Sequence, residues 1–134
     1  MKLSSKSISA IKMFSDLGEH YEEGFISLVD IAKRKELSKK FLEQIVPVFK
    51  NNDLLICNRG NQGGYKLSKS PNKITLKDIV YLTENSLSEV NNNDGSIDVV
   101  LNEVDALLDK YFSSVTLEKL IELEKESYSN NYFI

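Results

Sequence analysis

This 134-residue chain has very few of the side chains on which most catalytic and metal sites depend. It contains one cysteine, Cys57, and one histidine, His20. A single cysteine excludes an internal disulfide and any metal or cluster site that needs several cysteines from one chain. One histidine leaves little for histidine-based catalysis or for zinc binding. We therefore expect that the protein is not an enzyme.

Long apolar runs are also missing. No segment approaches the roughly 20 apolar residues that a membrane span needs, and the first residues lack the apolar stretch of a signal peptide. We therefore expect a cytoplasmic protein with no membrane partner. Apolar residues make up 41% and charged residues 28% of the chain. This composition is typical of a folded globular protein, and the length suits one compact core.

The small net charge of −3 hides an uneven distribution. Residues 1–77 carry 14 Lys and Arg against 8 Asp and Glu, whereas residues 78–134 carry 3 against 12. Between Lys33 and Lys77 there are 11 basic residues and 3 acidic ones. A basic first half is compatible with a polyanionic partner or with an ordinary solvated surface, and charge alone does not separate the two.

Helical periodicity dominates the first part of the chain. Apolar residues recur every three or four positions over residues 5–22, and Gly24 ends this helix. Residues 27–52 predict a short helix, a tight turn and a second helix, with Ser27 and Ser38 as the N-caps. This segment is therefore predicted to be a helix–turn–helix.

A hairpin and a long helix follow. Two short strand candidates are joined by a glycine-rich turn, and Thr75 then caps a short helix. Residues 97–112 carry the longest apolar periodicity, with one wide apolar face. The predicted fold is mainly α with a small β-hairpin wing. Its parts are a winged helix-turn-helix domain (1–84), a polar loop (85–96), a dimerisation helix and a short C-terminal helix (97–126), and a C-terminal tail (127–134).

A helix–turn–helix followed by a two-stranded wing can read DNA, with the second helix in the major groove. Lysine contacts phosphate or guanine, glutamine pairs with adenine, and glutamate accepts from cytosine. Glycines and basic residues in a wing suit a close approach to phosphates. The alternatives are an ordinary amphipathic surface helix and a hairpin whose glycines serve geometry only. The candidate DNA-binding residues from this pattern are Ser38, Lys39, Lys40, Glu43, Gln44, Arg59, Gly60, Gly63, Gly64 and Lys66.

Five short runs occur in order along the first 84 residues, and their combination is specific. They are MKLSSK at 1–6, SLVDIA at 27–32, SKKFLEQ at 38–44, RG with GGY at 59–65, and ITLKDI at 74–79. With these runs the chain resembles the Rrf2 family of transcriptional regulators. The resemblance implies a winged-helix homodimer that binds pseudo-palindromic double-stranded DNA, often as a repressor. It adds Lys6 and Ser27 to the candidate DNA-binding residues.

The long helix has more apolar surface than a chain of this length needs for its own core. We therefore predict that it packs against the same helix of a second copy. The alternative is a core helix of a monomer. The candidate dimerisation residues are Ile97, Val100, Leu101, Val104, Leu107, Leu108, Tyr111 and Phe112.

The cysteine content departs from that of many family members. Such members hold an iron–sulfur cluster with three cysteines in the loop before the dimerisation helix, and the corresponding residues 85–96 contain none. The resemblance therefore implies a cluster-free member with no cofactor and no metal. Cys57 is interpreted as a small apolar filler of the wing.

The last residues resemble the cluster-free branch that represses genes of cysteine and sulfur metabolism. In that branch cysteine synthase acts as corepressor. A polar run precedes Tyr132, Phe133 and Ile134, which suits an extended arm whose end enters a partner's pocket. The alternative is that these side chains pack on the protein itself or across the dimer. Two other functions stay open, a regulator that senses a small molecule in a dimer pocket and a winged-helix protein-interaction module without DNA binding.

Overall fold

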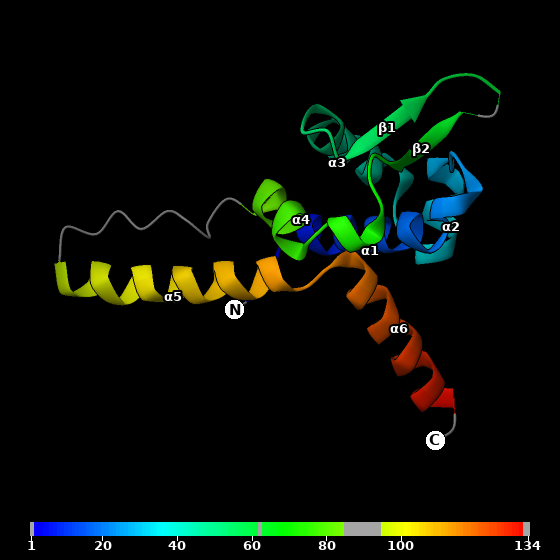
Figure 1. Ribbon diagram of the computed structural model, residues 1–134. Coiled ribbons are helices and arrows are strands. Elements are labelled where there is room, and N and C mark those ends of the chain that lie inside the picture. The colour runs from blue at the N-terminus through cyan, green and yellow to red at the C-terminus, as the bar shows by residue number, and fades with distance from the viewer. Residues whose placement is uncertain (1, 62, 85–94, 133–134) are drawn as a thin grey trace.

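The computed structural model describes residues 2–61, 63–84 and 95–132, and it consists of a helical body from which two helices project (Figure 1). Within these residues the elements are α1 (Ser5–Glu19), the 3-10 turn η1 (Tyr21–Glu23), α2 (Leu28–Lys35), α3 (Lys39–Asn51), β1 (Leu55–Asn58), β2 (Gly64–Leu67), the 3-10 turn η2 (Pro71–Lys73), α4 (Leu76–Thr83), α5 (Gly95–Ser114) and α6 (Leu117–Tyr132). This mainly α fold with a two-stranded hairpin confirms the predicted fold class.

Helix α1 is the centre of the body and packs against α2, α3, α4 and α6. The ring of Phe14 on α1 meets Phe49 on α3 edge-on, with ring centroids 4.7 Å apart and planes at 67°. Both rings are fully buried, together with Met13, Ile31 and Leu42. Phe14 and Leu17 of the apolar pattern in α1 are buried, but Ile8 is 41% exposed, and Ala10 and Met13 belong to the core instead. The helical period is therefore confirmed, and the predicted apolar face of α1 is correct only in part.

Hydroxyl side chains begin the helices of the body, as predicted. Ser27 and Ser38 each accept a hydrogen bond, 3.2 Å long, from the backbone N–H three residues further on. Thr75 forms a reciprocal capping box with Asp78. These bonds satisfy backbone donors that the first helical turn leaves open. Between α2 and α3, Glu36 adopts a left-handed backbone with φ of 54°, so the predicted helix–turn–helix is confirmed.

Helix α1 is shorter than the sequence pattern predicts. It ends at Glu19, and residues 21–23 tighten into η1 before Gly24. Gly24 has φ of 81°, a conformation that glycine adopts without steric cost. The predicted end at Glu22 is therefore wrong by three residues, because the last turn changes from α to 3-10 geometry.

Helix α6 is longer than predicted. It continues to Tyr132, so the polar run that we expected as an extended spacer is helical, and the predicted boundary at residues 126–127 is wrong. Residues 117–132 contain neither glycine nor proline, and nine of the sixteen are Glu, Lys or Leu. These residue types have high helix propensity, which explains the extension.

The wing is attached to the start of α2. Its strands are antiparallel, with Leu55 opposite Leu67 and Asn58 opposite Gly64. Tyr65 also exchanges two backbone hydrogen bonds, of 2.9 and 2.8 Å, with Ile26. The hairpin is therefore tied to the residues that enter α2, and its position relative to the helix–turn–helix is set by backbone contacts.

Helices α5 and α6 leave the body in different directions (Figure 1). Of the predicted polar loop, residues 85–94 lie outside the described residues, and residues 95–96 begin α5. Helix α6 crosses α1 closely, because a Cβ atom on Gly18 would lie 2.6 Å from the Cδ1 atom of Ile121. Among the helices that the structure describes, none combines the length and the apolar character required to cross a bilayer.

Candidate nucleic-acid interface

Helix α3 separates its apolar and polar side chains onto two faces. Its buried residues are Leu42, Ile45, Val46 and Phe49. The exposed residues at its start are those predicted to read DNA, Ser38, Lys39, Lys40, Glu43 and Gln44. They lie at the N-terminal end of the second helix, which is the end that contacts base edges in helix–turn–helix proteins. The structure therefore gathers these five predicted residues on one accessible surface.

Two of these side chains form an ion pair on the helix surface. Lys39 Nζ lies 3.5 Å from Glu43 Oε1, and the two side chains are 54% and 53% exposed. An exposed pair of this kind contributes little to stability, so a phosphate or a base can replace either partner. The side chains of Lys40 and Gln44 form no ion pair or hydrogen bond with other parts of the described chain. They are free to contact a ligand.

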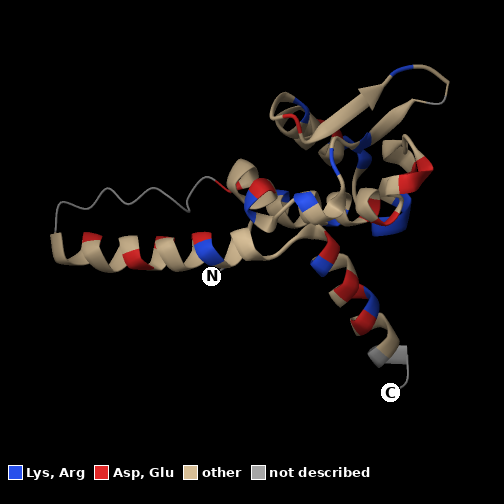
Figure 2. Ribbon diagram, viewed as in Figure 1, with Lys and Arg blue, Asp and Glu red and all other residues tan. Residues whose placement is uncertain are grey.

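The wing carries basic side chains at its tip and at its base. Arg59 is exposed and directly follows β1, and Figure 2 shows basic residues on the hairpin. Lys66 Nζ lies 4.9 Å from the centroid of the Phe25 ring, a cation–π contact that holds the ammonium group near the start of α2. Sequence reasoning missed Phe25, because the contact joins residues far apart in the chain and no local motif signals it.

One of the three wing glycines has a left-handed backbone. Gly60 has φ of 119°, whereas Gly63 and Gly64 have no positive φ. A Cβ atom on Gly64 would lie 2.3 Å from the carbonyl oxygen of Ile26, and one on Gly63 would lie 2.6 Å from that of Asn58. Gly63 and Gly64 therefore let the chain pack closely on itself. This packing agrees with the alternative that these two glycines serve geometry, and their approach to phosphate stays a prediction.

The remaining two candidates lie on different elements. The Ser27 hydroxyl caps α2, and its backbone lies next to Gly64 of the wing. Lys6 belongs to the first turn of α1, which is fastened to the end of α4. There Glu84 accepts hydrogen bonds from the Ser7 hydroxyl at 2.6 Å and from the Ser4 N–H at 3.1 Å. These bonds lower the pKa of Glu84.

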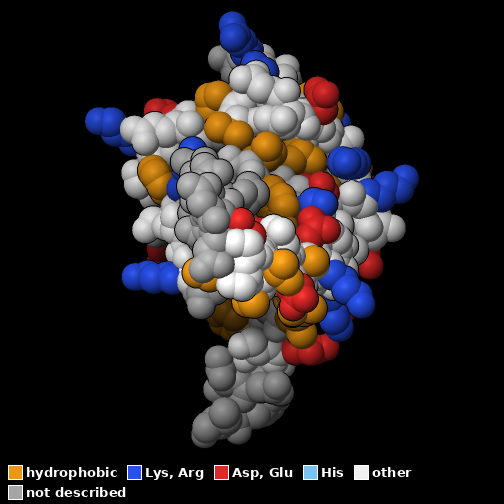
Figure 3. All heavy atoms as spheres, turned by 90° about the vertical axis from the view of Figure 1, so that its left-hand side faces the viewer, with side chains coloured by type: hydrophobic (Ala, Val, Ile, Leu, Met, Phe, Trp, Pro, Cys, Tyr) orange, Lys and Arg blue, Asp and Glu red, His pale blue; other side chains and the backbone are white. Residues whose placement is uncertain are grey.

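A stripe of apolar side chains is exposed along α5. Its members recur three and four residues apart, and they are Ile97, Val100, Val104, Leu107 and Tyr111. Their exposed fractions run from 43% to 68%. In Figure 3, where the free end of α5 points toward the viewer, hydrophobic side chains are exposed beside acidic ones. A repeat that averages 3.5 residues is typical of a seam between two helices, and we call these five residues the α5 stripe.

Of the other three predicted dimerisation residues, Phe112 faces the body. Phe112 is 5% exposed, and its ring meets that of Tyr81 on α4 at 6.3 Å. Leu101 and Leu108 are half-buried. Phe112 is therefore buried against α4 of its own chain and is not part of the exposed stripe. Its contact with a second copy stays a prediction.

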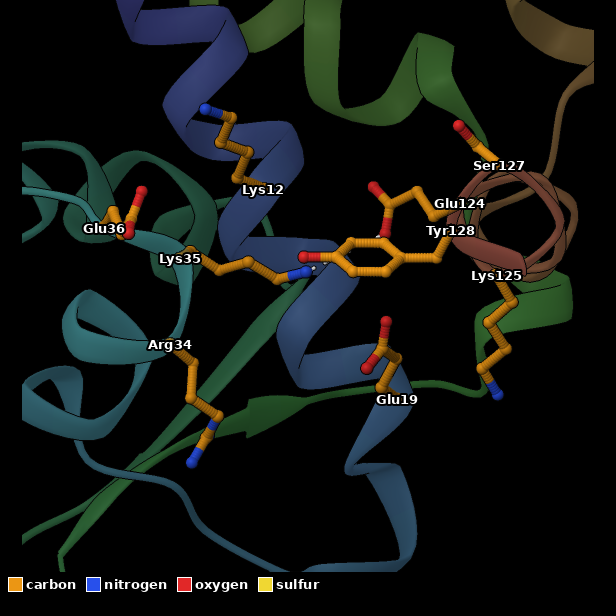
Figure 4. Close-up of a pocket in the computed structure, with 9 residues that line it drawn as sticks. All are labelled: Lys12, Glu19, Arg34, Lys35, Glu36, Glu124, Lys125, Ser127 and Tyr128. Carbon is orange, nitrogen blue, oxygen red and sulfur yellow. Dashed lines mark ion pairs between the residues drawn. The ribbon is translucent and has the colours of Figure 1, made fainter. Parts of the chain in front are cut away.

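A polar cavity of about 720 Å³ opens between α1, the end of α2 and α6 (Figure 4). Arg34 at its rim is held by the buried Asp16, to whose two carboxylate oxygens it donates at 2.8 Å. Lys35 Nζ lies 3.8 Å from Glu124 Oε2, and the exposed ring of Tyr128 extends into the cavity. The other lining residues are Lys12, Glu19, Glu36, Lys125 and Ser127. Charges of both signs suit a small polar molecule.

Two other sequence predictions concern Cys57 and the chain end. Cys57 is half-buried in β1, opposite Tyr65. In the described ranges, no three His, Cys, Asp or Glu side chains are grouped so that they could hold a metal ion. Of the predicted partner-binding tail, Tyr132 is the last residue of α6, and Phe133 and Ile134 lie outside the described residues.

Comparison with known families gives one match over most of the chain. Residues 3–123 match the family model Rrf2, which is described as an iron-dependent transcriptional regulator. The match includes the helix–turn–helix, the wing, α5 and the first half of α6. It therefore extends beyond the first 84 residues that carried the resemblance in the sequence.

Individual relatives agree with this match. Over 90 residues the chain is 37% identical to the HTH-type transcriptional regulator CymR of Bacillus subtilis, a segment that makes up 67% of this chain and 65% of that protein. The solved structure of B. subtilis CymR, the global cysteine regulator, superposes with a TM-score of 0.80 at 29% identity, covering 92% of this chain and 98% of that one. The structure of T. potens IscR superposes with a TM-score of 0.81 at 31% identity, covering 95% and 90%. These relatives are regulators and not enzymes.

Proposed function

This chain belongs to the Rrf2 family of transcriptional regulators, and from that premise we propose that it binds operator DNA sequence-specifically as a homodimer and represses transcription. The observation that carries the proposal is the polar face of α3, where Lys40 and Gln44 are exposed beside the Lys39–Glu43 pair. Helix α3 would lie in the major groove, and Arg59 at the wing tip would contact the backbone or minor groove.

The α5 stripe supports the homodimer. A two-fold axis would bring the same five residues of two copies together and cover them. Each copy would then present one α3, so the operator would be pseudo-palindromic, with half-sites about one helical turn apart. The protein would carry out this function in the cytoplasm, the compartment expected from its sequence.

The salt dependence of binding tests DNA recognition. Lys39, Lys40, Arg59, Lys66 and Lys69 from two subunits would neutralise phosphates, so the slope of log association constant against log salt should be on the order of −6 to −9. Replacing Lys39 and Lys40 by Gln should make the slope shallower by about 3 to 4, because four contacts per dimer are lost. The measurement is a fluorescence anisotropy titration on promoter DNA at several salt concentrations.

A matched control uses the two lysines of α6, Lys119 and Lys125, which are exposed on a different helix. Replacing both by Gln removes the same charge and should leave the slope unchanged. A slope near zero for the unmodified protein would contradict DNA binding and would favour a winged-helix module that contacts only proteins.

We further propose that the regulated genes belong to cysteine and sulfur metabolism. The support is the similarity to B. subtilis CymR, which is described as a global cysteine regulator. Because the matched segment spans 65% of that protein, the regulon of this chain stays a proposal. Mapping of genomic binding sites tests it directly, and a set of sites away from sulfur genes would contradict it.

Cysteine synthase is the proposed corepressor, with the chain end as its contact. Since α6 is helical as far as Tyr132, the contact would be the end of this helix together with Phe133 and Ile134. Replacing Phe133 and Ile134 by Ala should weaken binding to purified cysteine synthase at least tenfold in a calorimetric titration. Replacing the exposed Ser129 by Ala is the control, and equal affinities for all three proteins would contradict the contact.

We also propose that the protein works without an iron–sulfur cluster, although the family model is described as iron-dependent. Cys57 is the only cysteine in the sequence, and it lies in the wing rather than before α5. One thiolate per chain does not match the three or four cysteine ligands that such clusters take. The donor set therefore does not fit the cluster.

A second candidate function is regulation by a small polar molecule. The polar cavity between α1, α2 and α6 favours it, because Lys35 and Glu36 at its rim lie at the end of α2 and in the turn that leads to α3. A molecule bound there could change how α3 is presented to DNA. Unlike the alternative expected from the sequence, this cavity lies within one chain. Replacing Lys12 and Glu19 by Ala should abolish any effector response without changing DNA affinity in the absence of effector.

A further inference from the structure

Helix α5 is joined to the DNA-binding body mainly through α4. Lys77 Nζ on α4 lies 2.7 Å from Asp109 Oδ1 on α5. The same ammonium group lies 5.5 Å from the centroid of the Tyr81 ring, which in turn meets the ring of Phe112 edge-on. We call Lys77, Tyr81, Asp109 and Phe112 the α4–α5 clamp.

The Lys77–Asp109 bond stabilises the charged forms of both side chains. The bond to the Lys77 ammonium is the main cause that lowers the pKa of Asp109, and the neighbouring Tyr81 acts in the same direction. The pKa of Lys77 is correspondingly raised by its bond to Asp109. Burial and the Asp109 charge raise the pKa of Tyr81. All three side chains therefore keep the protonation states that hold the bond near neutral pH.

A backbone connection continues the clamp beyond the end of α5. The Leu76 N–H donates to the Val115 carbonyl at 2.9 Å, and the Leu117 N–H donates to the Ile74 carbonyl at 2.7 Å. These bonds fix the pivot where α5 meets the body. The direction of the α5 axis then depends on side-chain contacts in the last two turns of the helix, at Asp109 and Phe112.

The clamp and the α5 stripe lie on different sides of the same helix. Asp109 is two residues from both Leu107 and Tyr111 of the stripe, which at 100° per residue places it on roughly the opposite side. A second copy that covers the stripe would therefore leave the polar half of the clamp uncovered. In such a dimer, the two paired α5 helices connect the DNA-binding bodies. The clamp then determines the angle between each body and its own α5.

A small change of this angle matters for DNA. A helix of 20 residues is about 30 Å long. Tilting it by about 10° at one end moves the other end by about 5 Å, which exceeds the rise of one base pair, about 3.4 Å. A change of the clamp geometry can therefore displace a DNA-binding body by more than one base pair along the DNA, which is enough to change the preferred half-site spacing.

We propose that Lys77, Tyr81 and Asp109 are positioning residues that determine which half-site spacing the dimer accepts. This inference rests on the proposed function, because it requires a dimer that binds two half-sites. As an exposed ion pair, Lys77 and Asp109 contribute little to overall stability. Their effect is expected in the selectivity between spacings and not in folding or in binding to one half-site.

The test uses the full chain and a ladder of duplexes. The half-site is the one that the unmodified protein selects from a randomised DNA library, and the central spacer is then lengthened or shortened by one and two base pairs. For the unmodified protein, we expect affinity to fall at least tenfold when the spacer changes by two base pairs. For Asp109→Asn and for Lys77→Met, we expect this fall to shrink to less than threefold, with single half-site affinity within twofold of the unmodified protein.

Two controls make the result specific. Glu122→Gln breaks the exposed Lys119–Glu122 pair, which lies within α6 and joins no two elements, and it should keep the full spacing selectivity. The charge-swapped double variant, Lys77→Asp with Asp109→Lys, should recover most of the selectivity because the pair is restored in reverse.

Three results would overturn the proposal. One is an unchanged spacing profile in Asp109→Asn and Lys77→Met, and another is an equal loss of selectivity in Glu122→Gln. The third is a loss of dimers or of half-site binding in the two clamp variants, which would make the role merely structural. If instead the unmodified protein enriches no half-site from the library, the proposed DNA-binding function fails before the clamp is tested.

Discussion

A protein carrying Val100→Asp together with Leu107→Asp is expected to sediment as a monomer and to bind its operator at least about 100-fold more weakly than the unmodified protein. Both side chains belong to the α5 stripe and are 58% and 68% exposed, so neither supports the fold of a single chain. In a dimer they would be covered, and burying two unpaired carboxylates in each subunit is strongly unfavourable. Losing the second half-site contact removes the gain in effective concentration, typically 100-fold or more.

The control for this experiment places the same charges elsewhere on α5. Asn102 and Ser113 are exposed and lie away from the stripe. Asn102→Asp with Ser113→Asp should therefore remain dimeric and bind the operator with nearly unchanged affinity. The melting temperatures of the control and the stripe variant should be similar after correction for the stabilisation that dimer formation gives the control. A stripe variant that still sediments as a tight dimer would place the interface on another surface.

The sequence predicted those features that depend on local chemistry. The N-caps Ser27, Ser38 and Thr75 are predictable because a hydroxyl before an apolar helical pattern satisfies the same backbone donors in any fold. The helix–turn–helix and the hairpin followed from these caps, from the periodicity and from the glycine-rich turn. The exposed face of α3 was predictable for the same reason, since its buried and exposed residues alternate with helical period.

The features that the sequence did not predict depend on contacts between distant residues. The role of Gly64 follows from the Ile26 carbonyl that lies against it, and no motif near residue 64 reveals that neighbour. Phe112 belongs to the same apolar periodicity as the α5 stripe, and only the position of Tyr81 on α4 shows that it faces inward. The sequence pattern underestimates the length of α6 for a different reason, because the polar residues Ser129 and Asn130 suggest a spacer although no helix breaker precedes them.

Replacing Gln44 by Ala is expected to weaken operator binding by about 1–3 kcal/mol while leaving binding to random DNA almost unchanged. Gln44 is exposed on α3, and its amide has no partner in the described chain. Its neighbours Ile45 and Val46 are buried, so the backbone that carries it is firmly held. A glutamine amide pairs with adenine through two hydrogen bonds, and alanine cannot replace either of them.

Lys40→Ala provides the comparison, because a lysine that contacts phosphate contributes equally on every sequence. This substitution should weaken binding to operator DNA and to random DNA to the same extent. It should also make the slope of log association constant against log salt shallower by about 2 per dimer. Both variants should melt like the unmodified protein, since both side chains are exposed. Competition titrations with operator and random duplexes at one salt concentration separate the two outcomes. If Gln44→Ala instead lost the same affinity on both duplexes, Gln44 would be a backbone contact, and Glu43 or Lys39 would have to carry the sequence reading on this face of α3.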